Sequence, residues 1–221
     1  MDDAHSPGTV ELDEDVDPEL KKKLEATRMS AEERFEYAAN SMWGMYNFTA
    51  LRALMLAGGD WDKANEICEE VEKIMVGFVA NEFYNEHPPG DPAEIAMDRP
   101  MAAAGITDDF RATRDARNAV MADLVVMMNS YPKASFKITA FSPEEASYHI
   151  CGGCPRKDSL DTVASVSKER GMPNLLEGYD LFRICAGGAE GYEAAMPGVG
   201  GEGLKGMCKG DDHCEFRYFQ K

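Results

Sequence analysis

Two neighbouring runs of sequence decide the fold: Ser-Phe-Lys-Ile-Thr-Ala-Phe at 135–141 and Ala-Ser-Tyr-His-Ile-Cys at 146–151. The first run alternates polar and apolar side chains, and a Ser-Pro-Glu-Glu turn at 142–145 separates it from the second. Together the two runs predict an antiparallel hairpin. Because side chains two positions apart on a strand share a face, we expect His149 and Cys151 to point the same way.

A second hairpin is expected near the C-terminal end, where Leu204–Cys208 and Cys214–Phe219 have strand character and a tight turn joins them. Between the two hairpins, residues 157–170 and 175–195 have the pattern of helices. The glycine-rich segment 197–203 lacks the strand and helix that flank a phosphate-binding loop, so we expect a flexible connection there.

The N-terminal half predicts helices. Ser30-Ala31-Glu32-Glu33 is a capping box that opens a long helix, and Gly58-Gly59 ends it. Asp60 is then expected to cap a second helix with a broad apolar face, and the two helices form a hairpin. A third main helix is expected over 107–129. The apolar face of the hairpin suits a protein core or the seam of a homodimer.

These elements predict an α+β fold, in which an N-terminal helical hairpin or bundle precedes a small antiparallel sheet of about four strands with two interposed helices. Residues 1–17 are polar and acidic and are expected to form a disordered tail. A helical part follows over 18–130, beginning with a short helix that ends near residue 28, and a cysteine-rich α+β part covers 131–221. We expect 18–221 to be one folded unit.

Charge limits the classes of partner. The 221 residues carry a formal net charge of −17. Nucleic acids and anionic membranes bind proteins through clustered Lys and Arg, so neither is expected to be a partner of this chain. The chain has no pattern of an export signal or a membrane-spanning helix, so a cytoplasmic location is expected. In that compartment the six cysteines are expected to stay reduced, which favours metal binding or catalysis over disulfides.

Five of the six cysteines lie after residue 148, and this asymmetry predicts a site. Cys151 and Cys154 form a C-x2-C pair of the kind that wraps one tetrahedral ion, and Cys208 and Cys214 flank the second hairpin turn. One pair from each hairpin, with Cys185 in reserve, could hold zinc or iron, as a metal ion or an iron–sulfur cluster. The plainer interpretation is that all five are reduced thiols without a ligand.

A nucleophilic cysteine is the alternative chemistry. A thiol needs a neighbouring base to become a thiolate, and His149 could serve Cys151, while His213 could serve Cys214 from the turn. Asp211 could orient a histidine, although an acid in a hairpin turn commonly serves the turn itself.

The C-terminal run Gly203–Tyr218, with Gly210, Asp211, Cys214 and Phe216 in place, resembles the ending of the L-2-amino-thiazoline-4-carboxylic acid hydrolase-like family. A similar Gly-Asp-x-x-Cys-x-Phe ending occurs in the domain associated with 4-vinyl reductases. Both resemblances imply helices before an α+β domain. The first implies hydrolysis of a small molecule, and the second implies a binding domain for a small apolar ligand.

Three functional hypotheses follow from these patterns. The first is a small-molecule enzyme in which a cysteine or a metal-bound water attacks a C–N or C–S bond, with Cys151, His149, Cys214 and Asp211 as catalytic candidates. The second is a metal or iron–sulfur protein that serves electron transfer or a partner enzyme. The third is a non-catalytic domain that binds a small ligand between helices and sheet.

Overall fold

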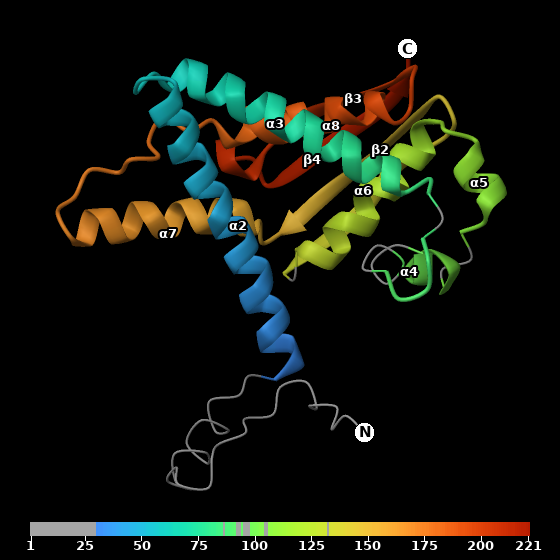
Figure 1. Cartoon of the computed structure of the whole chain (residues 1–221), viewed down its shortest axis with the longest axis horizontal. Helices are drawn as coiled ribbons and strands as arrows, with labels where there is room; N and C mark the ends of the chain where they lie inside the picture. Colours follow the sequence, from blue (N-terminus) through green and yellow to red (C-terminus); the bar gives the residue numbers. More distant parts are fainter. Residues whose placement is uncertain (1–29, 86, 92–93, 95–97, 104–105, 132) are drawn as a thin grey trace, which may run out of the picture. The chain divides into compact units, whose positions relative to one another are not determined.

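The computed structural model describes residues 30–85, 87–91, 94, 98–103, 106–131 and 133–221 (Figure 1). The chain divides into two compact units, 1–38 and 39–221. The acidic tail and the short helix expected before residue 28 lie outside the described residues. Among those described, no helix is both long enough and apolar enough to cross a membrane.

The first two described helices are α2 (Ala31–Leu56) and α3 (Trp61–Glu82). The predicted capping box is confirmed, because the Ser30 amide donates to Glu33 Oε2 at 2.7 Å and the Glu33 amide donates to Ser30 Oγ at 3.2 Å. Asp60 caps α3 as predicted, with Oδ1 accepting from the amides of Asp62 and Lys63. Local capping therefore fixes where both helices begin.

The third predicted helix is two helices. The structure has α5 (Asp108–Ala112) and α6 (Ala116–Ser130) where one continuous helix over 107–129 was expected, and the short α4 (Arg99–Ala103) precedes them. Arg114 adopts a φ of 47°, which an α-helix does not allow, and Asp115 caps α6 by accepting from the Arg117 amide. The prediction of one helix was wrong because the apolar residues keep the spacing of a helix on both sides of this break.

The strands are β1 (Ala134–Phe141), β2 (Glu145–Gly152), β3 (Val199–Lys205) and β4 (His213–Gln220). They form one antiparallel sheet in the order β1-β2-β4-β3, so two hairpins meet along the β2–β4 pairing. Helices α7 (Pro155–Glu169) and α8 (Leu181–Gly191) lie between the hairpins in sequence. The predicted α+β architecture is confirmed.

The two central strands separate a buried face from a partly exposed one. Tyr148 and Ile150 on β2, and Phe216 and Tyr218 on β4, are buried. Their neighbours in sequence point the opposite way, because side chains alternate along a strand. The buried face packs against α6 and α8, and α3 packs against α8 (Figure 1).

Glycines allow the backbone of α8 to pack closely against α3 and β3. A Cβ on Gly191 would lie 2.5 Å from the carbonyl oxygen of Lys73 on α3, and one on Gly201 of β3 would lie 2.1 Å from the carbonyl oxygen of Ala189. The expectation of a flexible connection over 197–203 was therefore wrong, since most of this segment is strand β3. Its glycines serve a close approach of helix and strand backbones.

A buried carboxylate joins the sheet to α6. Tyr148 and Tyr218 each donate a hydroxyl hydrogen bond to Asp123 Oδ2, at 2.5 and 2.6 Å. Burial raises the pKa of Asp123, while the tyrosine hydrogen bonds oppose that shift. The core of the molecule therefore contains a polar link between helix and sheet, in which the buried hydroxyls of Tyr148 and Tyr218 both have a partner.

Because β3 packs closely on α8, we predict that adding one methyl group destabilises the protein at Gly201 but not at Gly44. Gly201→Ala should lower the free energy of unfolding by about 1–3 kcal/mol, because the backbone of α8 must move away. Gly44→Ala is the matched control, since that Cβ meets only Ser159 Oγ at 3.8 Å and alanine favours the helix. Urea denaturation of both variants measures the difference, and equal stability of the two would contradict the packing described.

Candidate functional site

The candidate site is a largely enclosed cavity of about 40 Å3 between α3, α6, α8 and the buried face of the sheet. This volume has room for roughly three water molecules. Its walls are mainly apolar and include Val76, Met127, Ile150, Leu181, Phe182 and Phe216. The sites that bind small molecules in proteins are commonly apolar cavities with a few convergent polar groups.

Four of the predicted site cysteines line this one cavity. Cys154 lies at the N-cap of α7, Cys185 on α8, Cys208 in the 3-10 helix η3 (Met207–Lys209) and Cys214 on β4. Cys214 Sγ accepts from the Met207 amide at 3.4 Å, which connects the last two elements. Residues from four separate elements thus line one cavity, and Cys151 of the predicted set is not among them.

The environment of these sulfurs favours the neutral thiol. Burial raises the pKa of Cys185 and of Cys214 to about 12, and it also raises the pKa of Cys154 and Cys208. A thiolate is the reactive form of cysteine. In this arrangement the cavity-lining cysteines are therefore polarisable apolar groups rather than prepared nucleophiles.

Arg156, near the start of α7, is one of four charged residues that line the cavity, together with Glu72, Asp123 and Lys205. Its Nη2 donates to Glu72 Oε1 on α3 at 2.7 Å, and its Nη1 donates to Cys185 Sγ at 3.2 Å. The side chains of Arg156 and Glu72 are only 3% and 10% exposed. The third nitrogen of the guanidinium group, Nε, is buried without a hydrogen-bond partner.

Two aromatic rings of α2 lie against the same guanidinium. Arg156 Cζ is 4.6 Å from the ring centroid of Trp43 and 4.5 Å from that of Tyr46. Such cation–π contacts strengthen when the cation is removed from water. Neither Arg156 nor Glu72 was predicted as a site residue. A single arginine at a helix start and a single glutamate on an acidic helix have no sequence pattern that marks them as buried.

A thin wall separates the cavity from an open hollow of about 300 Å3 on the surface. Leu181, Phe182 and Cys208 line both spaces. The Phe182 ring is held from outside by Lys209, whose Nζ lies 4.2 Å from the ring centroid. A change in the position of these side chains would connect the cavity to solvent.

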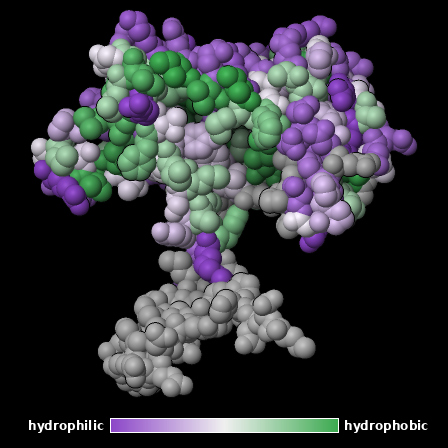
Figure 2. All heavy atoms as spheres, in the orientation of Figure 1, coloured by the Kyte–Doolittle hydropathy of each residue, from purple (hydrophilic) through white to green (hydrophobic). Residues whose placement is uncertain are grey.

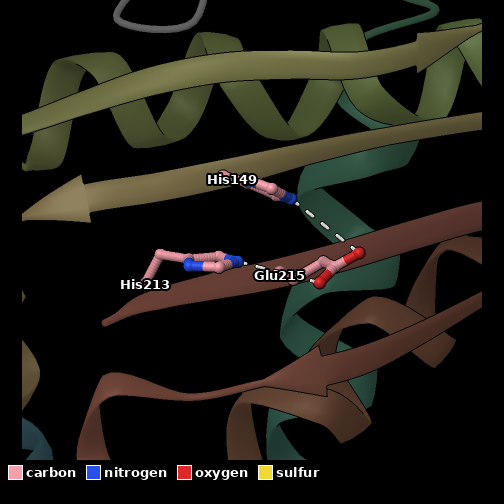
Figure 3. A group of neighbouring side chains, drawn as sticks. All are labelled: His149, His213 and Glu215. Carbon is pink, nitrogen blue, oxygen red and sulfur yellow. Dashed lines mark ion pairs between the residues drawn. The ribbon is translucent and has the colours of Figure 1, made fainter. Parts of the chain in front are cut away.

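The other predicted catalytic residues lie elsewhere. Cys151 and His149 are on the opposite, partly exposed face of the sheet, where the pairing places them across from His213 and Glu215. Figure 3 shows that the side chains of His149, His213 and Glu215 point toward one another from β2 and β4. Asp211 closes the turn before β4, because its Oδ2 accepts from the Gly206 amide at 2.8 Å.

The two cysteines of the C-x2-C pair therefore lie in different places: Cys151 is on the outer face of the sheet, and Cys154 lines the cavity. Gly152, with a φ of 88°, turns the chain between Cys151 at the end of β2 and Cys154 at the start of α7. Among the described residues, His149, His213 and Glu215 form the one group of three potential metal ligands whose donor atoms all lie within 4.8 Å of one another. No three of the four cavity sulfurs lie that close to one another.

No protein-family model matches the chain, and no curated protein matches its sequence. Its fold does match a solved structure, described as a trafficking protein particle complex subunit 3 from Naegleria fowleri covalently bound to palmitic acid. The match has a TM-score of 0.51 and 18% sequence identity, and it covers 84% of this chain and 96% of that chain. At this identity the similarity establishes a shared fold.

The positions of the six free cysteines predict an order of chemical labelling. Under native conditions with limiting iodoacetamide, Cys151 should be alkylated well before Cys154 and Cys214, because it is partly exposed and they are buried. Peptide mapping by mass spectrometry measures the order, and denatured protein, in which all six should react alike, is the control. Labelling of Cys214 as fast as Cys151 would contradict the enclosed cavity.

Proposed function

We propose that this chain is a binding domain for a small ligand with an apolar body and a hydrogen-bond-accepting head group. The ligand occupies the enclosed cavity and the adjoining hollow. The observation that carries this proposal is the Nε of Arg156, a buried donor without a partner on a side chain that lines a mainly apolar cavity. An unpaired buried donor costs free energy, so an acceptor supplied by a ligand would be favourable there.

The charges around Arg156 indicate which head group fits. Glu72 already neutralises the guanidinium, so a neutral acceptor such as a carbonyl oxygen is favoured over a second carboxylate. The ligand body would lie along the apolar wall and the thiols. It would extend past Phe182 into the hollow, because the cavity alone is too small for more than a few atoms.

The structure of similar fold supports this class of ligand. The protein from Naegleria fowleri is described as carrying palmitic acid, which has an apolar chain and an acyl head. That ligand belongs to that protein. For this chain it supports the hypothesis that a fold of this kind can carry an apolar chain. The resemblance to the 4-vinyl-reductase domain likewise implies a small apolar ligand.

An enzyme of the thiazoline-hydrolase type remains a prediction with less support. It would need a thiolate or a metal-bound water beside the substrate. The raised pKa values of Cys185 and Cys214 leave little thiolate at neutral pH. This favours binding over nucleophilic attack.

The four cavity thiols favour a metal ion or cluster as a second candidate function. Four cysteines around one small space are the ligand set that zinc and iron–sulfur clusters use. The sulfurs would have to approach one another, and each thiol would have to lose its proton. Metal and acid-labile sulfide analysis of anaerobically purified protein tests this candidate, and absence of both zinc and iron under those conditions would reject it.

The predicted homodimer also remains a proposal. Large apolar side chains are exposed on α2 and α3 (Figure 2), among them Met45, Phe48, Ile74 and Phe78, which are 66–73% exposed. An exposed apolar surface of this kind is typical of an interaction site. A single monomeric species in analytical ultracentrifugation at high protein concentration would reject the dimer.

Calorimetric titration with 2-octanone, a neutral carbonyl on an apolar chain, tests the ligand-binding proposal. We expect saturable binding of one molecule per chain. Cys208→Trp, which fills the wall between cavity and hollow, should weaken binding at least about tenfold, because contact with the apolar walls is lost. Phe182→Ala should accelerate association, since it removes the ring from the same wall.

Cys151→Ser is the matched control, because it changes a thiol on the other face of the sheet and should leave binding unchanged. Octanoate, as a carboxylate probe, should bind more weakly than the ketone. Absence of saturable binding for both probes, or equal effects of Cys208→Trp and Cys151→Ser, would overturn the proposal.

A further inference from the structure

The partly exposed face of the sheet contains a cluster of side chains that the ligand-binding cavity does not use. His149 pairs across the β2–β4 ladder with Glu215, and Cys151 pairs with His213. Directly opposite residues on antiparallel strands point to the same side. Four residues that commonly bind metals therefore form a two-by-two block on the two central strands.

Three members of the block already have nearly the spacing of ligands. His149 Nε2 lies 3.8 Å from Glu215 Oε1, and His213 Nε2 lies 3.7 Å from Glu215 Oε2. Ligands bound tetrahedrally at about 2.0–2.1 Å are separated by roughly 3.4 Å. These two distances, to different oxygens of Glu215, exceed that value by only a few tenths of an ångström. With one donor atom taken from each residue, all three lie within 4.8 Å of one another, so side-chain rotations would bring them to ligand spacing.

The histidine rings are prepared for this role. They stack with their centroids 4.1 Å apart, and both side chains are partly buried, with 22% and 12% exposed for His149 and His213. Asp212 Oδ1 lies 2.6 Å from His213 Nδ1. In a neutral imidazole, a carboxylate that accepts from Nδ1 selects the tautomer in which Nε2 is free to bind a metal, as in many zinc proteins.

A positive group already occupies this position. Lys205 Nζ lies 3.5 Å from His213 Nε2 and 3.5 Å from Glu215 Oε2. The side chain of Lys205 is 47% exposed, so it can swing into solvent. The space between the imidazole and the carboxylate thus accommodates a cation, and Lys205 is the internal competitor that a metal ion would displace.

We propose that His149, His213 and Glu215 form a zinc site on the outer face of the sheet, separate from the cysteine-lined cavity. The site links β2 to β4 through three protein ligands and leaves a fourth position for water. Lys205 lowers its affinity by competing for the same space. The nitrogen and oxygen donors suit Zn2+ rather than Mg2+ or Ca2+, which prefer oxygen ligands.

Zinc titration against a chromophoric chelator, with the protein kept reduced, tests the assignment. We expect one zinc per chain at this site. His149→Gln and His213→Gln should each weaken binding at least about tenfold, because each removes one of three ligands. Lys205→Met should strengthen binding several-fold, since it removes the competing ammonium group. Ligand removal is not expected to unfold the protein, because these side chains lie on the partly exposed face.

Two control variants separate this site from other sources of zinc binding. His87→Gln removes a histidine from another part of the chain, and Cys214→Ser removes a thiol from the cavity. Neither should change the affinity of the site formed by His149, His213 and Glu215, because neither residue is one of its ligands. Binding that survives His149→Gln and His213→Gln, or that disappears with Cys214→Ser alone, would overturn the proposal, as would the absence of stoichiometric binding in both the unmodified chain and Lys205→Met.

Discussion

The buried ion pair between Arg156 and Glu72 is the interaction on which the candidate site depends. Moving a guanidinium and a carboxylate out of water is costly, and the cost is offset only when geometry and additional contacts are good. Here Nη2 meets Glu72 at 2.7 Å, Nη1 meets the Cys185 sulfur, and two aromatic rings cover the guanidinium. One side chain thereby connects α7 to α3, α8 and α2, and it is one of the few charged groups that line the cavity.

Side chains alternate between the two faces of β4, so residues that are neighbours in sequence belong to two different sites. Cys214 and Phe216 point into the cavity, whereas His213 and Glu215 point to the outer face. The same period of two divides β2, where Ile150 is buried and His149 and Cys151 are not. A compact sequence cluster therefore contributes to two separate places, a thiol-lined cavity and a histidine–carboxylate group.

Much of this arrangement was predictable from local patterns. Alternating residues and turn signals predict the hairpins, capping residues predict where α2 and α3 begin, and period-two geometry predicts that His149 and Cys151 share a face. The sequence also indicated that cysteines from both hairpins converge, although spacing alone favoured Cys151 over Cys185. Gly152 turns the chain so that only Cys154 of the C-x2-C pair reaches the cavity.

The remaining features arise from tertiary packing that no local window contains. The segment 197–203 has the glycine-rich composition of a loop, but most of it is strand because it pairs with β4, and α8 approaches too closely for any side chain at Gly201. Arg156, Glu72 and Asp123 are ordinary charged residues in sequence, and only burial among distant elements gives them a role. The break at Arg114 is likewise hidden, because the apolar spacing on either side of it is helical.

The most direct test of this account is the free energy of unfolding of three proteins: the unmodified chain, Glu72→Ala and the double variant Glu72→Met/Arg156→Met. Glu72→Ala leaves a buried, unpaired guanidinium and should cost about 3–5 kcal/mol, whereas the double variant, which removes both charges, should recover most of that loss. This pattern would establish that the cavity is organised around a desolvated charge pair. A cost below about 1 kcal/mol for Glu72→Ala, the range of a solvent-exposed pair, would contradict it.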